Sequence, residues 1–260
     1  MVEICKEEKL PYFILGNGSN LLVSDKGYRG AVIQLWKNVS DIQVEGCLIQ
    51  AKAGASLAKI AAQALEAGLT GMEFAAGIPG TLGGAVVMNA GAYGGEMKDI
   101  LKEALVMDGE GRIFTLTKEE LKLGYRTSIV KEKGYIVLAA VLELQPGDRE
   151  EIRKLMEDLK QRRGEKQPLD MPSAGSTFKR PEGYFAGKLI MDAGLRGFSV
   201  GGAQVSEKHC GFVVNTGGAS ASDVLALIRE VQKRVREKFG VELETEVKFL
   251  GEFEEELCGL

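Results

Sequence analysis

Short apolar runs separated by turn residues recur along the chain, and this pattern predicts a protein rich in β-strands. Gly46, the turn at residues 108–111 and Pro146 mark the ends of several runs. The predicted strands cover residues 12–15, 21–23, 31–36, 41–44, 48–53, 104–107, 112–116, 135–144, 212–215 and 247–250, with a further strand near Val205.

Apolar residues at helical spacing lie between these strands. Ser56 is a typical N-cap, and Gly68 should end the helix that follows it. Thr117 and Glu120 have the spacing of a capping box, which predicts a short helix ending at Gly124. Further helices are expected at residues 1–10 (the end of an amphipathic helix), from Asp148 to Lys166, at 185–193, and after a cap at Ser220 or Ser222. Mixed helices and strands indicate an α+β fold.

Two glycine-rich segments interrupt the pattern. Residues 77–95 read GIPGTLGGAVVMNAGAYGG, and residues 16–20 read GNGSN between two apolar strands. Glycine allows close approach to the backbone, and turns rich in N–H groups bind phosphate oxygens. The residues leave two interpretations open, phosphate-binding turns or ordinary connections. Because GNG opens no helix, the dinucleotide fingerprint of doubly wound folds does not apply.

Composition narrows the function classes. A chain of 260 residues with 45% hydrophobic content can form two compact units. Its net charge of −4 argues against a nucleic-acid partner. The four cysteines lie far apart without metal-ligand spacing, which predicts free thiols in a reducing cytoplasm and no metal site. No apolar run is long enough for a membrane span, and the first residues do not resemble a signal peptide.

Few residues carry a recognisable catalytic pattern. HExxH and the phosphate-binding GKS or GKT are absent. Ser176 lies on a Gly-Ser turn shortly before Lys179, but with His209 as the single histidine a Ser–His–Asp hydrolase is not favoured. The cations near the end of the 148–166 helix could either stabilise the helix C-terminus or bind an anion. The residues alone therefore predict binding of a phosphate-bearing ligand without specifying a reaction.

Six segments in a fixed order carry a resemblance to a known family. They are NGSNLL at 17–22, GIPGTLGG at 77–84, NAGAYG at 89–94, GYRTS at 124–128, AGSTFK at 174–179 and LETEV at 243–247. Together they resemble the UDP-N-acetylenolpyruvoylglucosamine reductases, or UDP-N-acetylmuramate dehydrogenases, which are flavoenzymes of peptidoglycan and cell-wall synthesis. The resemblance covers nearly the whole chain, and the short spacing from Arg126 to Ser176 matches the family's type II form.

The resemblance implies an FAD-binding fold of the vanillyl-alcohol-oxidase (PCMH) type with a C-terminal α+β substrate domain. Residues 1–34 with 240–260 would form part of one FAD-binding subdomain, 35–165 the other, and 166–239 the substrate domain. Family members also carry an N-terminal strand–helix–strand segment, which is expected to be missing from this sequence.

The resemblance further implies NADPH-dependent, FAD-mediated reduction of UDP-N-acetylglucosamine enolpyruvate. It makes Ser176 the proton donor, while Arg126 and Glu246 stabilise the developing carboxylate charge; Glu244 is the alternative carboxyl, because residues two apart share one strand face. The implied substrate-binding residues are Tyr125, Arg162, Lys166, Lys179 and His209. The implied FAD-binding residues are Gly16, Asn17, Gly18, Ser19, Asn20, Gly77, Pro79, Gly80, Thr81, Gly83, Gly84, Asn89 and Ala90.

Two other functions remain open from the sequence. An FAD-dependent sugar or alcohol oxidase could use the same fold, although Ser176, Arg126 and Glu246 do not favour it. A nucleotide-binding fragment without turnover would follow if the missing N-terminal segment were essential. The first alternative predicts oxygen consumption, and the second predicts a colourless protein.

Overall fold

The computed structural model describes residues 1–253, which form two compact units. The first unit contains Met1–Asn17 and Gly30–Arg163, and the second contains Gly18–Arg29 and the residues from Gly164 onward. The chain therefore passes between the units inside the GNGSN segment, after Asn17.

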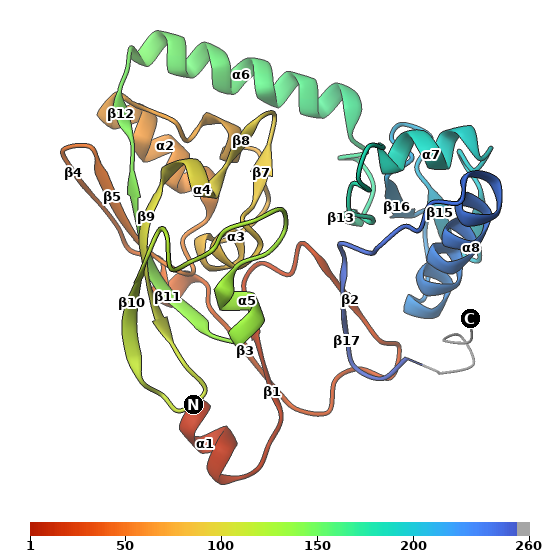
Figure 1. The fold of residues 1–260 in the computed structure, drawn as a ribbon, viewed down its shortest axis with the longest axis horizontal. Coiled ribbons are helices and arrows are strands. Elements are labelled where there is room, and N and C mark those ends of the chain that lie inside the picture. The colour runs from red at the N-terminus through yellow and green to blue at the C-terminus, as the bar shows by residue number, and fades with distance from the viewer. Residues whose placement is uncertain (254–260) are drawn as a thin grey trace. The chain divides into compact units, whose positions relative to one another are not determined.

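A five-stranded antiparallel sheet is the centre of the first unit (Figure 1). Its strand order is β10–β9–β11–β5–β4, so the longest strand, β11, lies in the middle. The strands are β4 (Ile42–Glu45), β5 (Leu48–Lys52), β9 (Leu101–Met107), β10 (Ile113–Thr117) and β11 (Ile136–Glu143).

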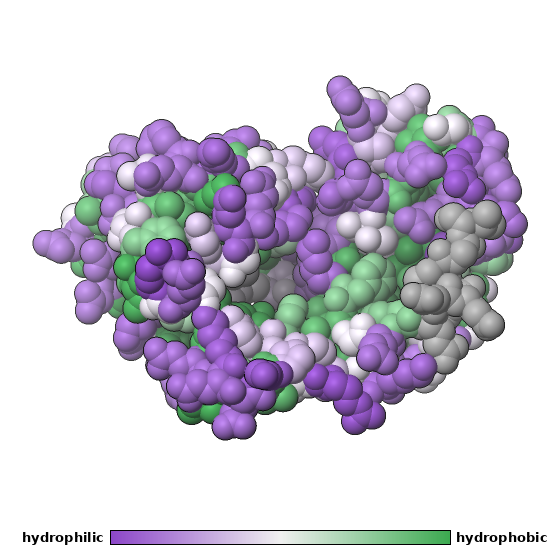
Figure 2. All heavy atoms as spheres, turned by 60° about the horizontal axis from the view of Figure 1, so that its bottom comes forward, coloured by the Kyte–Doolittle hydropathy of each residue, from purple (hydrophilic) through white to green (hydrophobic). Residues whose placement is uncertain are grey.

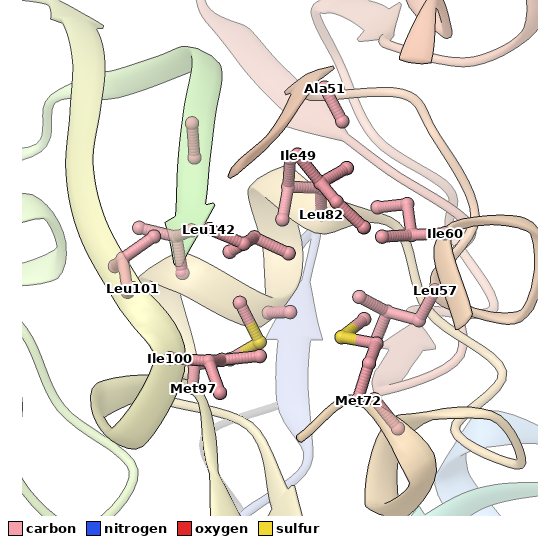
Figure 3. Packing of buried hydrophobic residues seen from close by; sticks show 14 of the residues in the cluster. Ile49, Ala51, Leu57, Ile60, Met72, Leu82, Met97, Ile100, Leu101 and Leu142 are labelled. Atoms are coloured by element: carbon pink, nitrogen blue, oxygen red, sulfur yellow. The ribbon is translucent and has the colours of Figure 1, made fainter. Parts of the chain in front are cut away.

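Helices α2 (Leu57–Ala67) and α3 (Leu82–Met88) pack against this sheet to form the main core. Ile49 of the sheet, Leu57 of α2 and Leu82 of α3 are each 0% exposed, and Figure 3 shows them converging. Burying such side chains contributes roughly 1.5–3 kcal/mol each. The core therefore fixes α3, and with it the middle of the glycine-rich segment.

Shorter elements complete the first unit. Strands β1 and β3 pair in parallel, and β6 with β12 and β7 with β8 form two-stranded pairs. These elements are α1 (Val2–Glu7), β1 (Tyr12–Leu15), β3 (Ala31–Gln34), η1 (Lys37–Val39), β6 (Leu69–Thr70), η2 (Glu73–Ala75), β7 (Gly91–Ala92), β8 (Gly95–Glu96), α4 (Met97–Ile100), α5 (Ile129–Lys133), β12 (Gln145–Pro146) and most of α6 (Arg149–Lys166).

The second unit has a four-stranded antiparallel sheet ordered β13–β16–β15–β14, with α7 and α8 in its core. A separate parallel pair joins β2 to β17. The elements are β2 (Leu21–Val23), β13 (Ser173–Ser176), α7 (Ala186–Asp192), β14 (Ser199–Val200), β15 (Ala203–Val205), β16 (Phe212–Asn215), α8 (Ala221–Phe239) and β17 (Lys248–Leu250).

The predicted strands are confirmed with small shifts at their ends, and Ser220 is the cap of α8. The predicted helix before Gly124 is wrong. Both capping-box bonds between Thr117 and Glu120 form, but the chain makes turns there, and Lys122 has φ 44°. That left-handed residue cannot continue a helix. The sequence prediction also missed α3, α5 and β13.

The two compact units divide the chain differently from the predicted domains. The boundary at Arg163 lies close to the predicted one, but residues 18–29 and the β17 region share the second unit. The three-part division stays a prediction. Within residues 1–253, no helix combines the length and apolar character needed to cross a bilayer. On the face drawn in Figure 2, hydrophilic residues predominate, with hydrophobic areas between them.

Candidate functional site

The two glycine-rich segments meet in the first unit. The Asn17 side chain donates from Nδ2 to the Pro79 carbonyl at 2.7 Å. A Cβ added at Gly16 would lie 2.4 Å from Thr81 Oγ1, closer than side-chain carbons come to such atoms. Gly16 therefore permits a contact between the segments that any side chain would obstruct.

Backbone N–H groups in these segments divide into two sets. Gly80 N donates to Ile78 O and Gly83 N donates to Ala53 O, both at 2.8 Å, so these N–H groups are used within the fold. Within residues 1–253, the N–H groups of Gly77, Thr81 and Gly84 donate no hydrogen bond. Pro79 has no N–H group. Gly77 and Gly84 are exposed, so their donors face solvent.

The GNGSN segment also offers donors in the part that belongs to the second unit. Within the described chain, the N–H groups of Gly18, Ser19 and Asn20 donate no hydrogen bond, and Gly18 has φ 73°. The Asn20 side chain donates to the Glu246 carbonyl at 3.2 Å, and Asn20 O accepts from Lys248 N at 3.0 Å. Asn20 thus joins this segment to the strand that follows Glu246.

Arg126 lies beside the glycine-rich segment of the first unit. Its guanidinium donates from Nη1 to Asn89 O at 3.4 Å and from Nη2 to Gly91 O at 3.3 Å. The Arg126 guanidinium also lies 5.2 Å from the centroid of the Tyr125 ring. Tyr125 itself is 51% exposed. Ala90, the residue after Asn89, is half-buried and donates its N–H to Ala85 O.

Ser176 and Glu246 lie on neighbouring backbone segments in the second unit. Glu246 N donates to Thr177 O at 2.8 Å, Lys179 N donates to Glu244 O at 2.9 Å, and Phe178 pairs with Thr245. On the other side of the Ser176 strand, Ser176 pairs with Phe212. Within residues 1–253, the Ser176 hydroxyl makes no hydrogen bond. Its proton is therefore not committed to another described group.

The two candidate carboxyls differ in their surroundings. Glu244 Oε2 lies 2.5 Å from Lys179 Nζ, and its side chain is 73% exposed. Glu246 is only partly exposed, and its backbone is bonded on both sides, to Thr177 and Asn20. Ion pairs at exposed positions contribute little. The two carboxyls therefore differ in exposure and in the ion pair that Glu244 makes with Lys179, and the Glu246 backbone lies beside the Ser176 strand.

His209 lies in the turn that leads into β16. Its Nδ1 accepts a hydrogen bond from Gly211 N at 3.1 Å, and its ring packs edge-to-face on Phe212. The imidazole is exposed on one side, and desolvation on the other lowers its pKa below the ordinary value. The neutral ring therefore carries its proton on Nε2, which makes that atom a hydrogen-bond donor.

The predicted cations occupy distinct positions on α6. Arg162 pairs with Asp158, through Nη2 and Oδ2 at 2.8 Å, and is 55% exposed. Lys166 is the exposed last residue of the helix. Arg163, which the sequence analysis did not select, lies at the glycine-rich segment: a Cβ on Gly77 would be 2.8 Å from its Nε.

Arg163 also lies over the Tyr93 ring, 5.7 Å from the centroid. Desolvation lowers the pKa of its guanidinium. Arg163 falls seven residues after Met156 and eleven after Ile152, so helical spacing places it on the apolar face of α6. That periodicity was the available signal for its inward position.

Comparison with known proteins decides the family. The chain is 60% identical to the UDP-N-acetylenolpyruvoylglucosamine reductase of Agathobacter rectalis, covering 97% of this chain and 84% of that protein. It is also 60% identical to the enzyme of the same name from Caldanaerobacter subterraneus subsp. tengcongensis, covering 97% and 83%. The chain belongs to the UDP-N-acetylenolpyruvoylglucosamine reductase family.

Domain models and a crystal structure agree with this reductase family. Residues 167–250 match the C-terminal domain of UDP-N-acetylenolpyruvoylglucosamine reductase, and residues 1–117 match an FAD binding domain. The crystal structure of UDP-N-acetylenolpyruvylglucosamine reductase from Thermus caldophilus matches with a TM-score of 0.83 and 40% identity, covering 96% of this chain and 90% of that one. The predicted α+β FAD-binding fold and the FAD-dependent oxidoreductase activity are confirmed.

The first unit fits the FAD expected of a reductase of this family. A diphosphate needs several backbone donors that side chains do not cover. The exposed residues Gly77 and Gly84 carry N–H groups that donate no hydrogen bond within residues 1–253, and so does Thr81, which is 2% exposed.

Proposed function

We propose that the chain catalyses the NADPH-dependent reduction of UDP-N-acetylglucosamine enolpyruvate to UDP-N-acetylmuramate, a step of peptidoglycan precursor synthesis. FAD, when bound, accepts a hydride from NADPH and supplies it to the methylene carbon of the enolpyruvyl ether. The 60% identity over 97% of the chain supports this reaction. The free thiols of Cys5, Cys47 and Cys210 support the cytoplasmic location that we propose with it.

Three residues of this chain would complete the reduction. Addition of hydride to the alkene leaves an electron pair on the carbon that carries the carboxylate, and that charge spreads into the carboxylate. Arg126 stabilises the charge with its fixed guanidinium, and Glu246 donates a hydrogen bond from its protonated carboxyl. The Ser176 hydroxyl transfers its proton to the carbon, which completes the saturated product, and the serine regains a proton from solvent.

The remaining predicted residues would bind the substrate. Lys179 and Lys166 supply positive charge for the diphosphate of the UDP group, and Arg162 would have to leave Asp158 to join them. His209 donates from Nε2 to an oxygen near the enolpyruvyl group. The exposed ring of Tyr125 offers an apolar surface beside Arg126.

The FAD diphosphate would be bound by backbone donors rather than by side chains. We assign this role to those N–H groups of residues 16–20, and of Gly77, Thr81 and Gly84, that donate no hydrogen bond within the protein. The N–H groups of Gly80 and Gly83 are used within the fold, so Gly80 would act by allowing close approach of the ligand, whereas Gly83 lets α3 pack closely on Ala53. Pro79 fixes the position of Asn17 through its carbonyl.

The observation that carries the catalytic assignment is the pairing of the Ser176 strand with the Glu246 segment, together with the uncommitted Ser176 hydroxyl. The experiment is to purify the protein with added FAD, record its visible spectrum, reduce it anaerobically with NADPH and add the enol ether. Return of the oxidised flavin absorbance with formation of UDP-N-acetylmuramate is expected. A colourless protein, or reduced flavin that oxygen but not the enol ether reoxidises, would overturn the proposal.

A further inference from the structure

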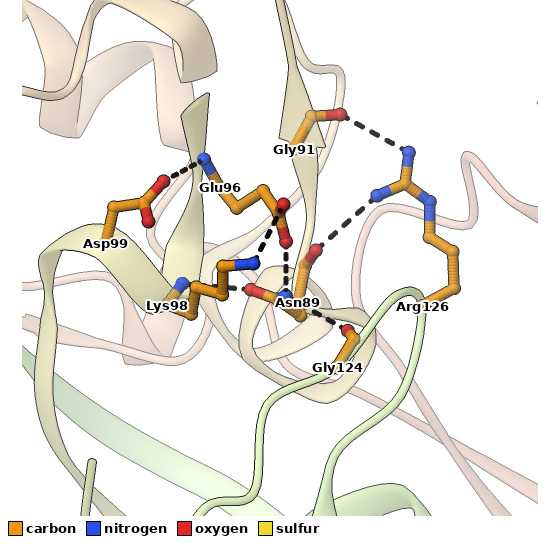
Figure 4. A network of polar contacts seen from close by, with 7 residues as sticks. All are labelled: Asn89, Gly91, Glu96, Lys98, Asp99, Gly124 and Arg126. Carbon is orange, nitrogen blue, oxygen red and sulfur yellow. Dashed lines mark hydrogen bonds and ion pairs between the residues drawn. The ribbon is translucent and has the colours of Figure 1, made fainter. Parts of the chain in front are cut away.

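A polar network centred on one buried side chain joins the glycine-rich segment to the loop that carries Arg126 (Figure 4). Asn89 is at its centre and is 0% exposed. Its Nδ2 donates to Glu96 Oε2 at 2.7 Å and to Gly124 O at 3.0 Å, while its Oδ1 accepts from Lys98 N at 2.9 Å. These partners lie on two stretches of chain, one with Glu96 and Lys98 and the other with Gly124.

The Asn89 amide has no donor left for a ligand. A primary amide carries two N–H groups, and both are used, one on Glu96 and one on Gly124. The family resemblance places Asn89 near the flavin, but its side-chain contacts point to the neighbouring loop. An amide that is fully buried and fully bonded can influence the reaction only through the groups that it contacts.

Those groups lead directly to Arg126. Gly124 and Thr127 exchange two backbone hydrogen bonds, of 3.1 and 3.3 Å, and so close the turn that contains Arg126. Asn89 contacts this turn twice, through Nδ2 on the Gly124 carbonyl and through its own carbonyl, which accepts from Arg126 Nη1.

Backbone conformation supports the same conclusion. Asn89 has φ 43° and Arg126 has φ 54°, values in the left-handed region that non-glycine residues adopt at a cost in free energy. Such conformations persist where surrounding contacts fix them, and they concentrate at functional sites. Here the two left-handed residues are bonded to each other, so each stabilises the conformation of the other.

We propose that Asn89 is a positioning residue for Arg126, and that Glu96 orients the Asn89 amide. Glu96 accepts a hydrogen bond from Asn89 Nδ2 on Oε2 and another from Lys98 Nζ on Oε1, the latter at 3.1 Å. Its carboxylate therefore fixes which end of the Asn89 amide faces Gly124. The inference rests on the proposed function, because Arg126 must stabilise charge in that reaction. It assigns Asn89 no contact with FAD through its side chain.

The test uses Asn89→Gly, because glycine retains the left-handed backbone and removes only the amide. We expect FAD affinity, the visible spectrum and flavin reduction by NADPH to stay close to wild type. Reoxidation by the enol ether should slow by about 10- to 100-fold, as for loss of one or two hydrogen bonds to a charged group. Lys122→Gly is the matched control, since Lys122 is exposed, also left-handed at φ 44°, and absent from the network.

A double-mutant cycle with Arg126→Ala separates positioning from general destabilisation. If Asn89 acts through Arg126, the double variant should reoxidise no more slowly than Arg126→Ala alone. If the two substitutions slow reoxidation multiplicatively in the double variant, the inference is wrong. It is also wrong if the FAD affinity of Asn89→Gly falls as much as its reoxidation rate. An unchanged reoxidation rate in Asn89→Gly would also overturn the inference. The proposed function would still stand in that case, as long as the wild-type protein turns over the enol ether.

Glu96→Gln provides a second variant if Asn89→Gly does not fold. Glutamine replaces one of the two carboxylate oxygens, which accept separately from Asn89 and Lys98, with an NH₂ donor, so one of these bonds is lost in the present geometry. As in Asn89→Gly, reoxidation by the enol ether should slow while reduction by NADPH stays normal, but the slowing should be smaller. Equal changes in both half-reactions would contradict the orienting role of Glu96.

Discussion

The surroundings of Arg126 and of Ser176 differ in how each reactive group is placed. In the first unit, the Arg126 guanidinium is bonded to two carbonyls, and the buried Asn89 side chain fixes its loop. In the second unit, main-chain pairing places Ser176, and its hydroxyl makes no hydrogen bond within residues 1–253.

This difference matches the chemistry proposed for the two groups. A cation that stabilises developing charge is most effective when its orientation is fixed before the reaction. A proton donor must release its proton, so a hydroxyl already bonded to a protein acceptor would be a poorer choice. The comparison predicts that the site around Arg126 is sensitive to remote side chains, whereas Ser176 depends mainly on the backbone.

The largest expected effect is at the proton donor. Ser176→Ala should slow reoxidation of the flavin by the enol ether about 10²- to 10⁴-fold, the usual contribution of a general acid. Reduction by NADPH should be nearly unchanged, because that half-reaction does not use the Ser176 proton. Stopped-flow absorbance measures both steps. Ser173→Ala, on the same strand, is the matched control, and equal losses in both half-reactions would exclude Ser176 as the donor.

The two glutamates provide the next test. Glu246→Ala should slow reoxidation about 10²- to 10³-fold, because it removes the hydrogen-bond donor that the protonated carboxyl supplies to the substrate charge. Glu244→Ala removes an exposed partner of Lys179, so its reoxidation rate should change less than about fivefold. Measured rates of substrate reduction for both variants decide the assignment. A larger loss in Glu244→Ala would move the role to that residue.

Sequence reasoning located most elements because their signals are local. Ser56 and Gly68 bound α2 as predicted. Ser220, one of the two predicted caps, begins α8 and forms a capping box with Asp223. The motifs likewise identified Ser176 and Arg126 as candidates. These features depend on residues within a few positions of one another.

Tertiary contacts determined what the sequence did not reveal. Helix α3 contains Gly83 and Gly84, which are poor helix formers, and it is stabilised by the complete burial of Leu82 and Val86. Strand β13 contains Gly175 at φ 79°, and its pairing with β16 joins segments some forty residues apart. Burial and register of this kind are not visible in local periodicity.

Thr177 is the clearest residue that sequence reasoning missed. It is 3% exposed, its N–H donates to Gly211 O, and its carbonyl accepts from Glu246 N. Its hydroxyl oxygen accepts from Val213 N at 3.0 Å. A polar, β-branched residue between Ser176 and Phe178 was the only sign of this role in the sequence.

The third prediction concerns the contact between the glycine-rich segments. Gly16→Ala should weaken FAD binding about tenfold, because its Cβ would overlap Thr81 Oγ1. Adding Thr81→Ala should restore part of the affinity by removing that oxygen. Fluorescence titration with FAD gives the dissociation constants. Rescue by Thr81→Ala would show that this contact sets the affinity, whereas an equal loss in the double variant would count against it.

The smallest effect on activity is expected from Thr177→Val, which separates backbone from side-chain placement of Ser176. Valine has a similar shape and retains both main-chain bonds, but it leaves the buried Val213 N–H without its acceptor. Such a loss costs roughly 1–3 kcal/mol of unfolding free energy, which denaturant titration can measure. Thr216→Val, at an exposed hydroxyl, is the control.

If main-chain pairing places Ser176, reoxidation of Thr177→Val by the enol ether should stay far above the Ser176→Ala rate. A rate as low as that of Ser176→Ala, in a folded variant, would mean that side-chain contacts place the proton donor as they place Arg126.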